Sequence, residues 1–375
     1  MLQSMSVLLA AAKVSLIALP IIIVAVFVMF VVALQVHAKR VVRSGSAQRS
    51  ETGGSAAKAE RKYDSLWEIR FDTLYSYKGN AAHVVVPEGV EEVFVNAFAE
   101  NQTLESIVLP QSLKEIHSMA FRECPNLREV VLPDHFDWDE TSCYFTQCSN
   151  LSAVTYHGVR YTDFVVDNGV LLLCLVKDQN VQTPQGVYRI GGNAFVSTSN
   201  ESYYEVRVSE GVTEIGEDAF SAVDIKRLIL PSTLQTFAEG AITFCPDLEW
   251  VDLAGVAQFD DLLIFGDIVI AALGNKNSYT VPEGVKRIGN YAFGSPDELT
   301  SLTLPESLES IGNKAFAYCR YLTRLTVPQG VQDIGEAAFG DWCSDQVLKI
   351  PQHFESTAKG DDFWNEDCEA EIVYY

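Results

Sequence analysis

The feature that most constrains the fold is a segment that the chain repeats. The sequence "VPEGVKRIGNYAF" spans residues 281–293, and close copies occur at 86–98, 183–195 and 327–339. When the chain is aligned on the residue that ends this segment, the pattern recurs nine times, in three groups of three, with intervals of 22 to 25 residues inside each group. The aligned positions are Phe98, Phe121, Phe145, Phe195, Phe220, Ile242, Phe293, Phe316 and Phe339. Self-similarity at this period is typical of a solenoid, in which stacked repeats bury a face that one repeat cannot cover alone.

A second, longer period is present. Between the groups the spacing doubles, because an apolar insertion begins at Phe164 and again at Leu262. The two insertions align without a gap at an offset of 98 residues, and residues 73–90 resemble a shorter third copy. We predict a β-hairpin at each place. The larger unit is then a module of one hairpin and three repeats, with modules at 66–158, 159–256 and 257–355.

Each repeat has a plan that can be read from one example. In "LTSLTLP" (299–305) alternate Leu residues point inward from a short strand, and the Pro ends the strand because it cannot donate a ladder hydrogen bond. The following segment, 307–319, turns at Gly312, where we expect backbone angles that a Cβ would resist. It then buries Phe316 and Cys319 in a tight turn or short helix.

The pattern L-x-x-L-x-L-P followed by I-G-x-x-A-F-x-x-C closely resembles the BspA-like, treponemal-type leucine-rich repeats, over roughly 80–355. The resemblance implies surface or secreted binding proteins, adhesins among them, without shared catalytic residues. Three units depart from the pattern, because Phe145 lacks its Ala, Ile242 replaces Phe, and "VFVNAF" (93–98) loses the Gly. We expect these units to pack less regularly.

The N-terminal region differs from the rest. Residues 14–35 carry no charge over 22 residues, which is enough to span a bilayer of about 30 Å as a helix. A cleaved signal peptide is the alternative, although the apolar run exceeds the usual signal core. The predicted organisation is a short segment at 1–13, a transmembrane helix at 14–35, a basic, Ser/Gly/Ala-rich flexible tether at 36–65, the solenoid at 66–355 and a C-terminal cap at 356–375.

The charge of the chain excludes one class of partner. The formal net charge is −23, and from residue 63 onward 19 basic residues stand against 48 acidic ones. Nucleic-acid binding needs clustered Lys and Arg, so we exclude a nucleic-acid partner.

Catalytic and cofactor motifs are also missing. The sequence contains no HExxH, GxSxG, GxxxxGK[ST] or GxGxxG motif and no Cys/His metal spacing, so we predict no enzyme activity, no cofactor and no metal. Two acidic clusters, 134–140 and 361–367, lack the spacing of a Ca²⁺ loop, and we interpret them as solvated turns.

Four of the eight cysteines follow the repeat. Cys124, Cys148 and Cys319 each lie three residues after an aligned Phe, and Cys245 lies three after Ile242. A residue type that recurs at one repeat position reads as a small buried side chain in a ladder, so we predict reduced structural thiols. Acceptor sequences for N-glycosylation begin at Asn101, Asn150 and Asn200, and their use depends on the source of the chain.

The strand face gives the one indication of a binding site. The x positions of L-x-x-L-x-L point away from the core, and those of the middle group are the richest in Tyr, Trp and Arg. The candidate partner-binding residues are Tyr204, Glu205, Arg207, Lys226, Arg227, Glu249, Trp250 and Asp252. We expect Glu205, Arg227 and Trp250 to form one column across the sheet. The same column is also what a stabilising cross-strand ladder would look like, and the sequence leaves both interpretations open.

Two functions follow as hypotheses. The first is a membrane-anchored, non-enzymatic recognition or adhesion protein whose strand face binds a protein or glycan outside the cell. The second is a cytosol-facing, membrane-tethered scaffold for protein interactions, which the basic residues at 39–43 favour under the positive-inside rule. The ligand, the orientation, the cleavage of the N-terminus and the oligomeric state are not given by the sequence.

Overall fold

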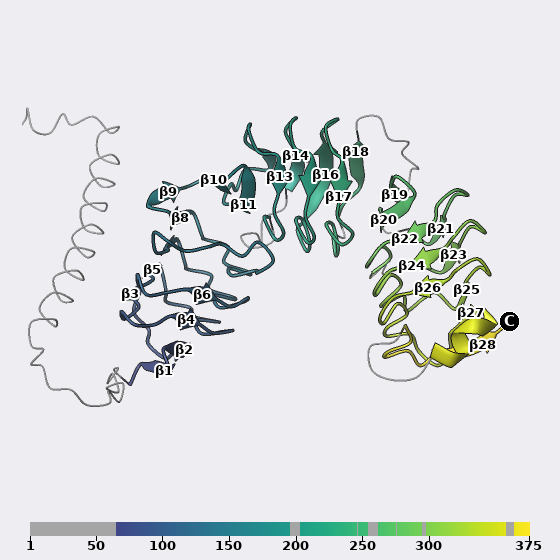
Figure 1. Cartoon of the computed structure of the whole chain (residues 1–375), viewed down its shortest axis with the longest axis horizontal. Helices are drawn as coiled ribbons and strands as arrows, with labels where there is room; N and C mark the ends of the chain where they lie inside the picture. Colours follow the sequence, from purple (N-terminus) through teal and green to yellow (C-terminus); the bar gives the residue numbers. More distant parts are fainter. Residues whose placement is uncertain are drawn as a thin grey trace, which may run out of the picture. The chain divides into compact units, whose positions relative to one another are not determined.

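The computed structural model describes residues 65–195, 203–245, 247–253, 262–274, 276–294, 298–357 and 364–375. These all lie in one compact unit, Tyr63–Tyr375. Within it, short strands are stacked side by side and joined by turns (Figure 1). The strands fall into three modules, β1–β9, β10–β18 and β19–β28, and each module has two kinds of sheet. We name them the hairpin sheet and the strand-face sheet.

The hairpin sheet is a β-hairpin followed by parallel strands of two residues. In the first module it contains β1 (Trp67–Arg70), β2 (Thr73–Tyr77), β4 (Glu92–Val93) and β6 (Glu115–Ile116). In the second it contains β10 (Phe164–Asp167), β11 (Val170–Cys174), β13 (Arg189–Ile190), β15 (Glu214–Ile215) and β17 (Thr236–Phe237). In the third it contains β19 (Leu262–Phe265), β20 (Ile268–Ala272), β22 (Arg287–Ile288), β24 (Ser310–Ile311) and β26 (Asp333–Ile334). The predicted hairpins that begin at Phe164 and Leu262 are therefore present, whereas the hairpin of the first module spans 67–77 and only its second strand lies in the predicted copy at 73–90.

The strand-face sheet is built from the L-x-x-L-x-L segments, which pair in parallel. The first module has β3 (His83–Val85), β5 (Ser106–Val108), β7 (Glu129–Val131) and β8 (Ala153–Tyr156), with β9 (Val159–Tyr161) antiparallel to β8. The second has β12 (Asn180–Gln182), β14 (Tyr203–Arg207), β16 (Ile225–Leu230) and β18 (Trp250–Leu253). In the third, β21 (Ser278–Thr280) pairs with β23 (Ser301–Thr303), and β25 (Arg324–Thr326) pairs with β27 (Val347–Ile350) in a separate sheet.

The end of the array is closed by the chain itself. The last strand, β28 (Glu371–Tyr374), lies in the segment predicted as a C-terminal cap and pairs in parallel with β27. The 3₁₀ helix η1 (Gln352–Thr357) precedes it, and the nearby Trp364 is buried against the core of the third module. The residue limits predicted for the modules and for the cap stay predictions.

The repeated Phe residues form the centre of each module. All nine aligned side chains are buried, and neighbouring rings stack, with centroids 5.0 Å apart for Phe98–Phe121 and 5.4 Å apart for Phe293–Phe316. Two of the units that depart from the pattern still join this core: Phe145 stacks on Phe121 at 5.4 Å, and Ile242 is 4% exposed. The expectation of looser packing at these two units is not met, because each position still places a large apolar side chain in line.

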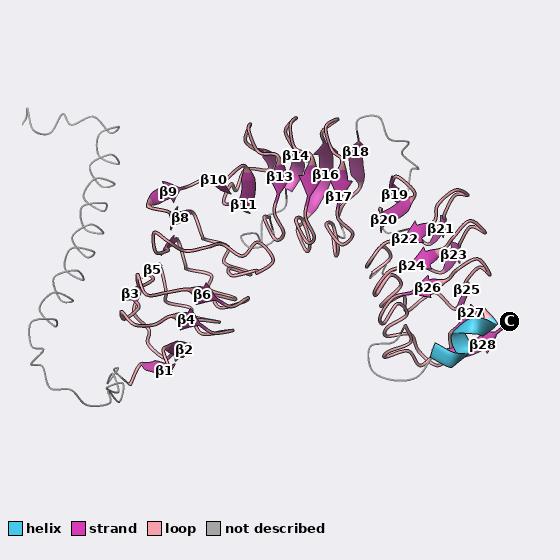
Figure 2. Cartoon of the chain, viewed as in Figure 1, coloured by secondary structure: helices cyan, strands magenta, loops and turns pink. Residues whose placement is uncertain are grey.

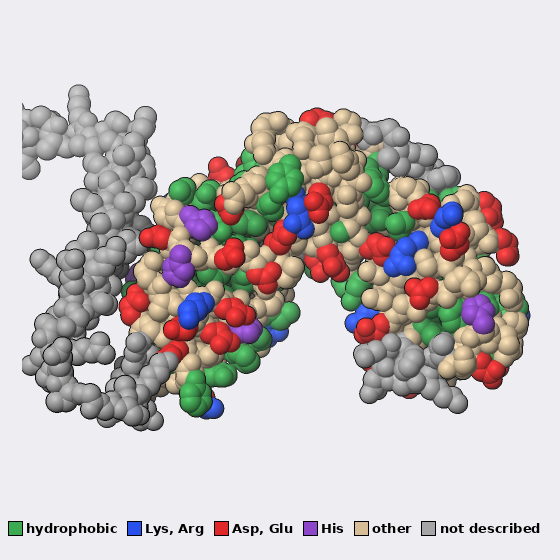
Figure 3. Space-filling view, in the orientation of Figure 1, with side chains coloured by type: hydrophobic (Ala, Val, Ile, Leu, Met, Phe, Trp, Pro, Cys, Tyr) green, Lys and Arg blue, Asp and Glu red, His purple; other side chains and the backbone are tan. Residues whose placement is uncertain are grey.

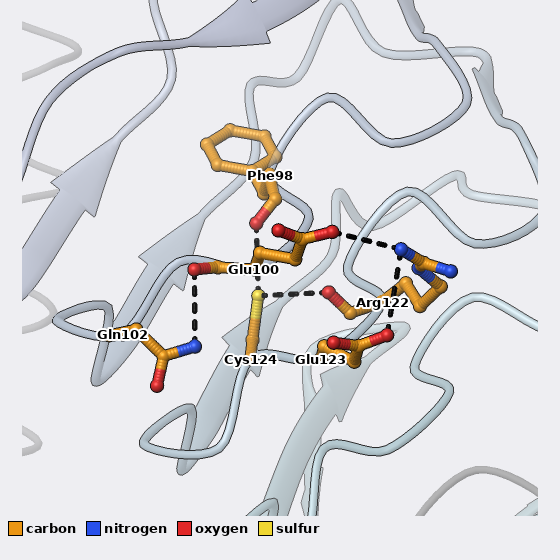
Figure 4. Close-up of polar contacts among 6 residues, drawn as sticks. All are labelled: Phe98, Glu100, Gln102, Arg122, Glu123 and Cys124. Carbon is orange, nitrogen blue, oxygen red and sulfur yellow. Dashed lines mark hydrogen bonds and ion pairs between the residues drawn. The ribbon is translucent and has the colours of Figure 1, made fainter.

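The cysteines bond to the backbone of this ladder. The thiol of Cys124 donates to the carbonyl oxygen of Phe98 at 3.0 Å (Figure 4), and Cys148, Cys245 and Cys319 donate in the same way to the Phe one repeat earlier. Trp342 occupies the corresponding place in the last repeat, and its Nε1 donates to Phe316. All eight cysteines of the chain lie in the described residues as reduced thiols, as predicted.

The fold class predicted from the sequence needs correction. Within the described ranges no helix is long and apolar enough to cross a membrane. The prediction of a fold with a transmembrane helix ahead of the solenoid is therefore wrong, and residues 14–35 lie outside the described residues. The prediction rested on composition alone, and a charge-free run of the right length does not by itself establish the helix that a membrane span requires.

For the segment around each Phe the sequence left a tight turn or a short helix open, and the described residues form turns there (Figure 2). Left-handed residues explain this, because at six of the nine aligned positions the described residues include one two positions before and one two positions after. Around Phe316, Lys314 has a φ of 50° and Tyr318 a φ of 63°. Such residues interrupt a right-handed helix.

The reason for Gly312 also differs from the predicted one. Its φ is not left-handed. A Cβ at this position would lie 2.5 Å from Asn290 Oδ1 and 2.6 Å from Asn290 N. Glycine is therefore required because the neighbouring repeat approaches too closely for a side chain.

Candidate binding surface

The eight candidate residues lie on the strand-face sheet of the second module. The register of the four strands places Asn180, Glu205, Arg227 and Trp250 side by side, as the sequence predicted for the last three. The next outward column consists of Gln182, Arg207, Ile229 and Asp252. The intervening residues, such as Val206 and Leu228, are buried. The alternation therefore fixes which side chains face solvent.

Ion pairs organise the centre of this face. The carboxylate of Glu205 lies between two arginines, with Oε1 2.9 Å from Arg207 Nη2 and Oε2 3.5 Å from Arg227 Nη1. The Glu205 side chain is 20% exposed and the two arginines are 47% and 40% exposed. Because the pairs face water, each contributes about 0–1 kcal/mol to stability, and their main effect is to hold the three side chains in place.

Aromatic side chains flank the ion pairs. Tyr204 is 51% exposed and Trp250 is 48% exposed. Trp250 is the direct neighbour of Arg227 in the register, yet within the described residues the cation–π contacts lie elsewhere, at Arg70–Tyr75 and Lys314–Tyr291. Arg227 is thus held by the carboxylate, and the indole of Trp250 remains available.

The remaining candidates lie at the rim. Glu249 and Asp252 are exposed, and Lys226 is half-buried. The structure thus brings all eight residues to one face. Whether this face binds a partner stays a prediction.

The sequence pattern alone did not reveal one strand of this surface. The segment Asn180–Gln182 adds β12 to the edge of the sheet, and its outward residues extend both columns. The sequence feature that indicates this strand is the polar–apolar–polar alternation N-V-Q immediately before the turn "TPQG". The structure buries its central Val181. The strand escapes a repeat search because β12 lacks the leading Leu of the repeat.

The strand faces of the other modules carry smaller or less varied side chains. The third module presents Ser278, Ser301, Thr280 and Thr303 in register, and the first presents His83, Ser106, Glu129 and Ala153. In the first, Arg160 Nε of β9 pairs with Glu129 Oε1 at 2.7 Å. Among the strand faces, only that of the second module combines Tyr, Trp and two Arg in the described residues.

No metal site accompanies this surface. The described residues contain no group of three or more His, Cys, Asp or Glu side chains that could hold a metal ion. The acidic segment 134–140 forms a turn in which Asp139 Oδ1 accepts hydrogen bonds from Thr141 and Oδ2 from Ser142. Burial opposes the charge of Asp139, but these hydrogen bonds outweigh it and hold the pKa of Asp139 below its usual value. The second acidic segment lies partly outside the described residues.

Comparisons with known proteins agree with the repeat pattern. A family model described as "BspA type Leucine rich repeat region" matches in six copies, over residues 69–163, 174–262 and 270–366. A comparison with curated proteins gave no match.

Several solved structures are similar. A leucine rich cell surface protein from Faecalibacterium prausnitzii is 21% identical, with 84% of this chain and 94% of that chain covered and a TM-score of 0.43. The leucine rich repeat protein of T. pallidum is 22% identical, with 51% and 82% covered and a TM-score of 0.29. The pneumococcal vaccine antigen PcpA is 16% identical, with 74% and 76% covered and a TM-score of 0.33.

Proposed function

Because the chain belongs to the BspA-type leucine-rich repeat family, we propose that it is a non-enzymatic recognition protein that binds another protein through the strand face of its second module. A leucine-rich repeat solenoid has the architecture of a protein-interaction or adhesion module. The single observation that carries the finer proposal is the Glu205–Arg207–Arg227 cluster with Tyr204 and Trp250 half-exposed beside it. Trp, Tyr and Arg are the residues that dominate binding energy at protein interfaces.

The balance of forces favours binding over a purely structural role. Solvent-facing ion pairs of this kind contribute little to stability, so the cluster is not needed to hold the sheet together. The hydrophobic ladder beneath it already supplies that stability, since Val206, Leu228 and Val251 are buried. A preorganised set of charged and aromatic side chains, in contrast, lowers the entropy that binding must overcome.

Photo-crosslinking tests the proposal because it captures whichever protein contacts the chosen position. The full chain is expressed in its own host with p-benzoylphenylalanine in place of Tyr204, and in a control with the same residue in place of Thr303 on the strand face of the third module. We expect a discrete protein adduct from position 204 and none from position 303. Equal adducts from both positions, or none from position 204, would contradict the proposal.

We further propose that the strand face is displayed outside the cell, in line with the surface and secreted proteins that the repeat pattern resembles. The alternative is an interaction scaffold inside the cell, and the reduced state of all eight cysteines favours it, because reduced thiols persist in the cytosol. External protease added to intact cells separates the two: loss of the solenoid supports display outside, and protection until lysis supports the scaffold.

A further inference from the structure

The two junctions between modules are built alike. At the first junction, Glu140 Oε1 accepts a hydrogen bond from Arg189 Nη1. At the second, Glu239 receives Arg287 through Nε at 2.7 Å and Nη2 at 3.1 Å, and its Oε2 also accepts the backbone N–H of Asn290 at 3.0 Å. Each preceding module thus places a carboxylate on an arginine of the first two-residue strand in the next hairpin sheet, β13 or β22.

The apolar parts of the two junctions also correspond. Leu172 of the second hairpin is 6% exposed and belongs to the core of the first module, and Ile270 of the third hairpin is 3% exposed and belongs to the core of the second. Gly191 leaves room for the covering carboxylate, because a Cβ there would lie 3.0 Å from Glu140 Oε2. We call the face of a module that meets the preceding module its opening face. In the second and third modules this face is covered by a carboxylate and by apolar surface of the preceding module.

Among the residues that the structure describes, nothing covers the same face of the first module. When the first module is aligned with the second, Tyr75 occupies the position of Leu172, and Phe94 occupies the position of Gly191. Tyr75 is 38% exposed, Phe94 37% and the adjacent Val95 38%. The rings of Tyr75 and Phe94 are 5.0 Å apart, and the ring of His117 follows 5.1 Å beyond Phe94. Figure 3 shows hydrophobic side chains at this end of the first module, near β1 and β2.

The charge of this opening face is reversed. Glu92 occupies the place of Arg189 and Arg287. Glu115 is its neighbour in the register. Burial opposes the charge of Glu92, but hydrogen bonds from His117 at 2.5 Å and from Thr73 at 2.8 Å prevail and keep the pKa of Glu92 below its usual value. An element that covers this face has to bring a cation where the other junctions bring an anion.

We propose that this opening face, Tyr75, Glu92, Phe94, Val95 and Glu115, binds a segment of a partner protein that carries a Lys or Arg beside an apolar side chain. The apolar side chain packs on Tyr75 and Phe94, and the cation pairs with Glu92 and Glu115. Terminal repeats of solenoids need a polar outer face for solubility, so exposed aromatic residues here indicate a contact surface.

A second copy of this chain, stacked end to end, does not fit the face. Glu336 of the third module corresponds to Glu239 by the module offset. It is an exposed acid and would meet Glu92 with like charge. The charge of the face thus selects a basic partner.

Selection from a random library of 12-residue peptides displayed on phage tests the inference on the full chain. The selected peptides are then measured by biolayer interferometry against wild type, Glu92→Arg, Phe94→Gly and, as a matched charge reversal elsewhere, Glu309→Arg. We expect the peptides to carry Lys or Arg within two positions of Phe, Leu or Trp. Their affinity should fall at least tenfold on Glu92→Arg and Phe94→Gly and change less than twofold on Glu309→Arg.

Three results would overturn the inference. They are selected peptides without Lys or Arg, peptides that bind all variants equally, and sedimentation that shows a dimer abolished by Phe94→Gly, which would assign the face to a second copy. If Glu92→Arg does not fold, as judged by its melt, Glu92→Gln removes the charge and retains hydrogen-bonding capacity toward Thr73 and His117. Unchanged peptide affinity for Glu92→Gln would then count against the inference.

Discussion

Truncation of Phe293 measures how much the ring ladder contributes to stability. The side chain is 1% exposed, its ring stacks on Phe316 at 5.4 Å and meets Tyr279 edge-on at 5.8 Å, and its carbonyl accepts the Cys319 thiol. Phe293→Ala removes a buried ring and leaves a cavity that the stacked neighbours cannot fill. Such changes cost about 3–5 kcal/mol.

Urea titration followed by circular dichroism gives the loss in the free energy of unfolding. Tyr321→Ala is the matched control, because Tyr321 is an aromatic residue of the same module that is 60% exposed. We expect a change within about 0.5 kcal/mol for the control. A loss below about 1 kcal/mol for Phe293→Ala, with an unchanged slope, would refute the account of the ladder as the main source of stability.

Two further predictions concern the backbone and the thiols. Ala222 is exposed with a φ of 55°, so Ala222→Gly removes left-handed strain and should stabilise by about 0.5–1 kcal/mol in thermal melts, whereas Ala81→Gly, exposed and without a left-handed φ, should destabilise. Burial raises the pKa of the Cys174 and Cys245 thiols to about 12. An unfolded thiol ionises near pH 8.5, so the free energy of unfolding should hold below that pH and fall toward pH 12 as the unfolded state loses the protons that the folded state keeps. Cys245→Ala should make this decline shallower by about 1.4 kcal/mol per pH unit, and an identical slope would contradict the assignment.

The fold could be predicted where one residue type recurs at one position. At the nine aligned positions and at the cysteine positions, each repeat needs a side chain of a given size to fill the core. The structure buries Phe121 and Cys124, as this need predicts. The turns could not be predicted in detail, because left-handed residues such as Lys314 and Tyr318 are not marked by glycine. These turns also bond to the next repeat, as Phe316 N–H does to Ala338 O at 2.8 Å, and a pattern within one repeat does not show such contacts.

The candidate surface was predictable in register but not in its contacts. Alternation along the strands placed Glu205 beside Arg227, and the structure has them in that register. The alternation in the sequence could not show that Arg207, two residues along the same strand, also pairs with Glu205. The opening face of the first module was missed because its residues differ from the repeat, and a pattern search discards such differences.

The double variant Arg227→Ala/Trp250→Ala tests the central claim most directly, namely that recognition and stability reside in different residues. It is measured twice, by adduct yield from position 204 and by thermal melt. The claim predicts at least a tenfold loss of adduct with a stability change of about 1 kcal/mol or less, because the 3.5 Å pair of Arg227 to Glu205 faces water and the Trp250 side chain is 48% exposed. An unchanged adduct yield with a loss of several kcal/mol would show that the surface is a structural ladder.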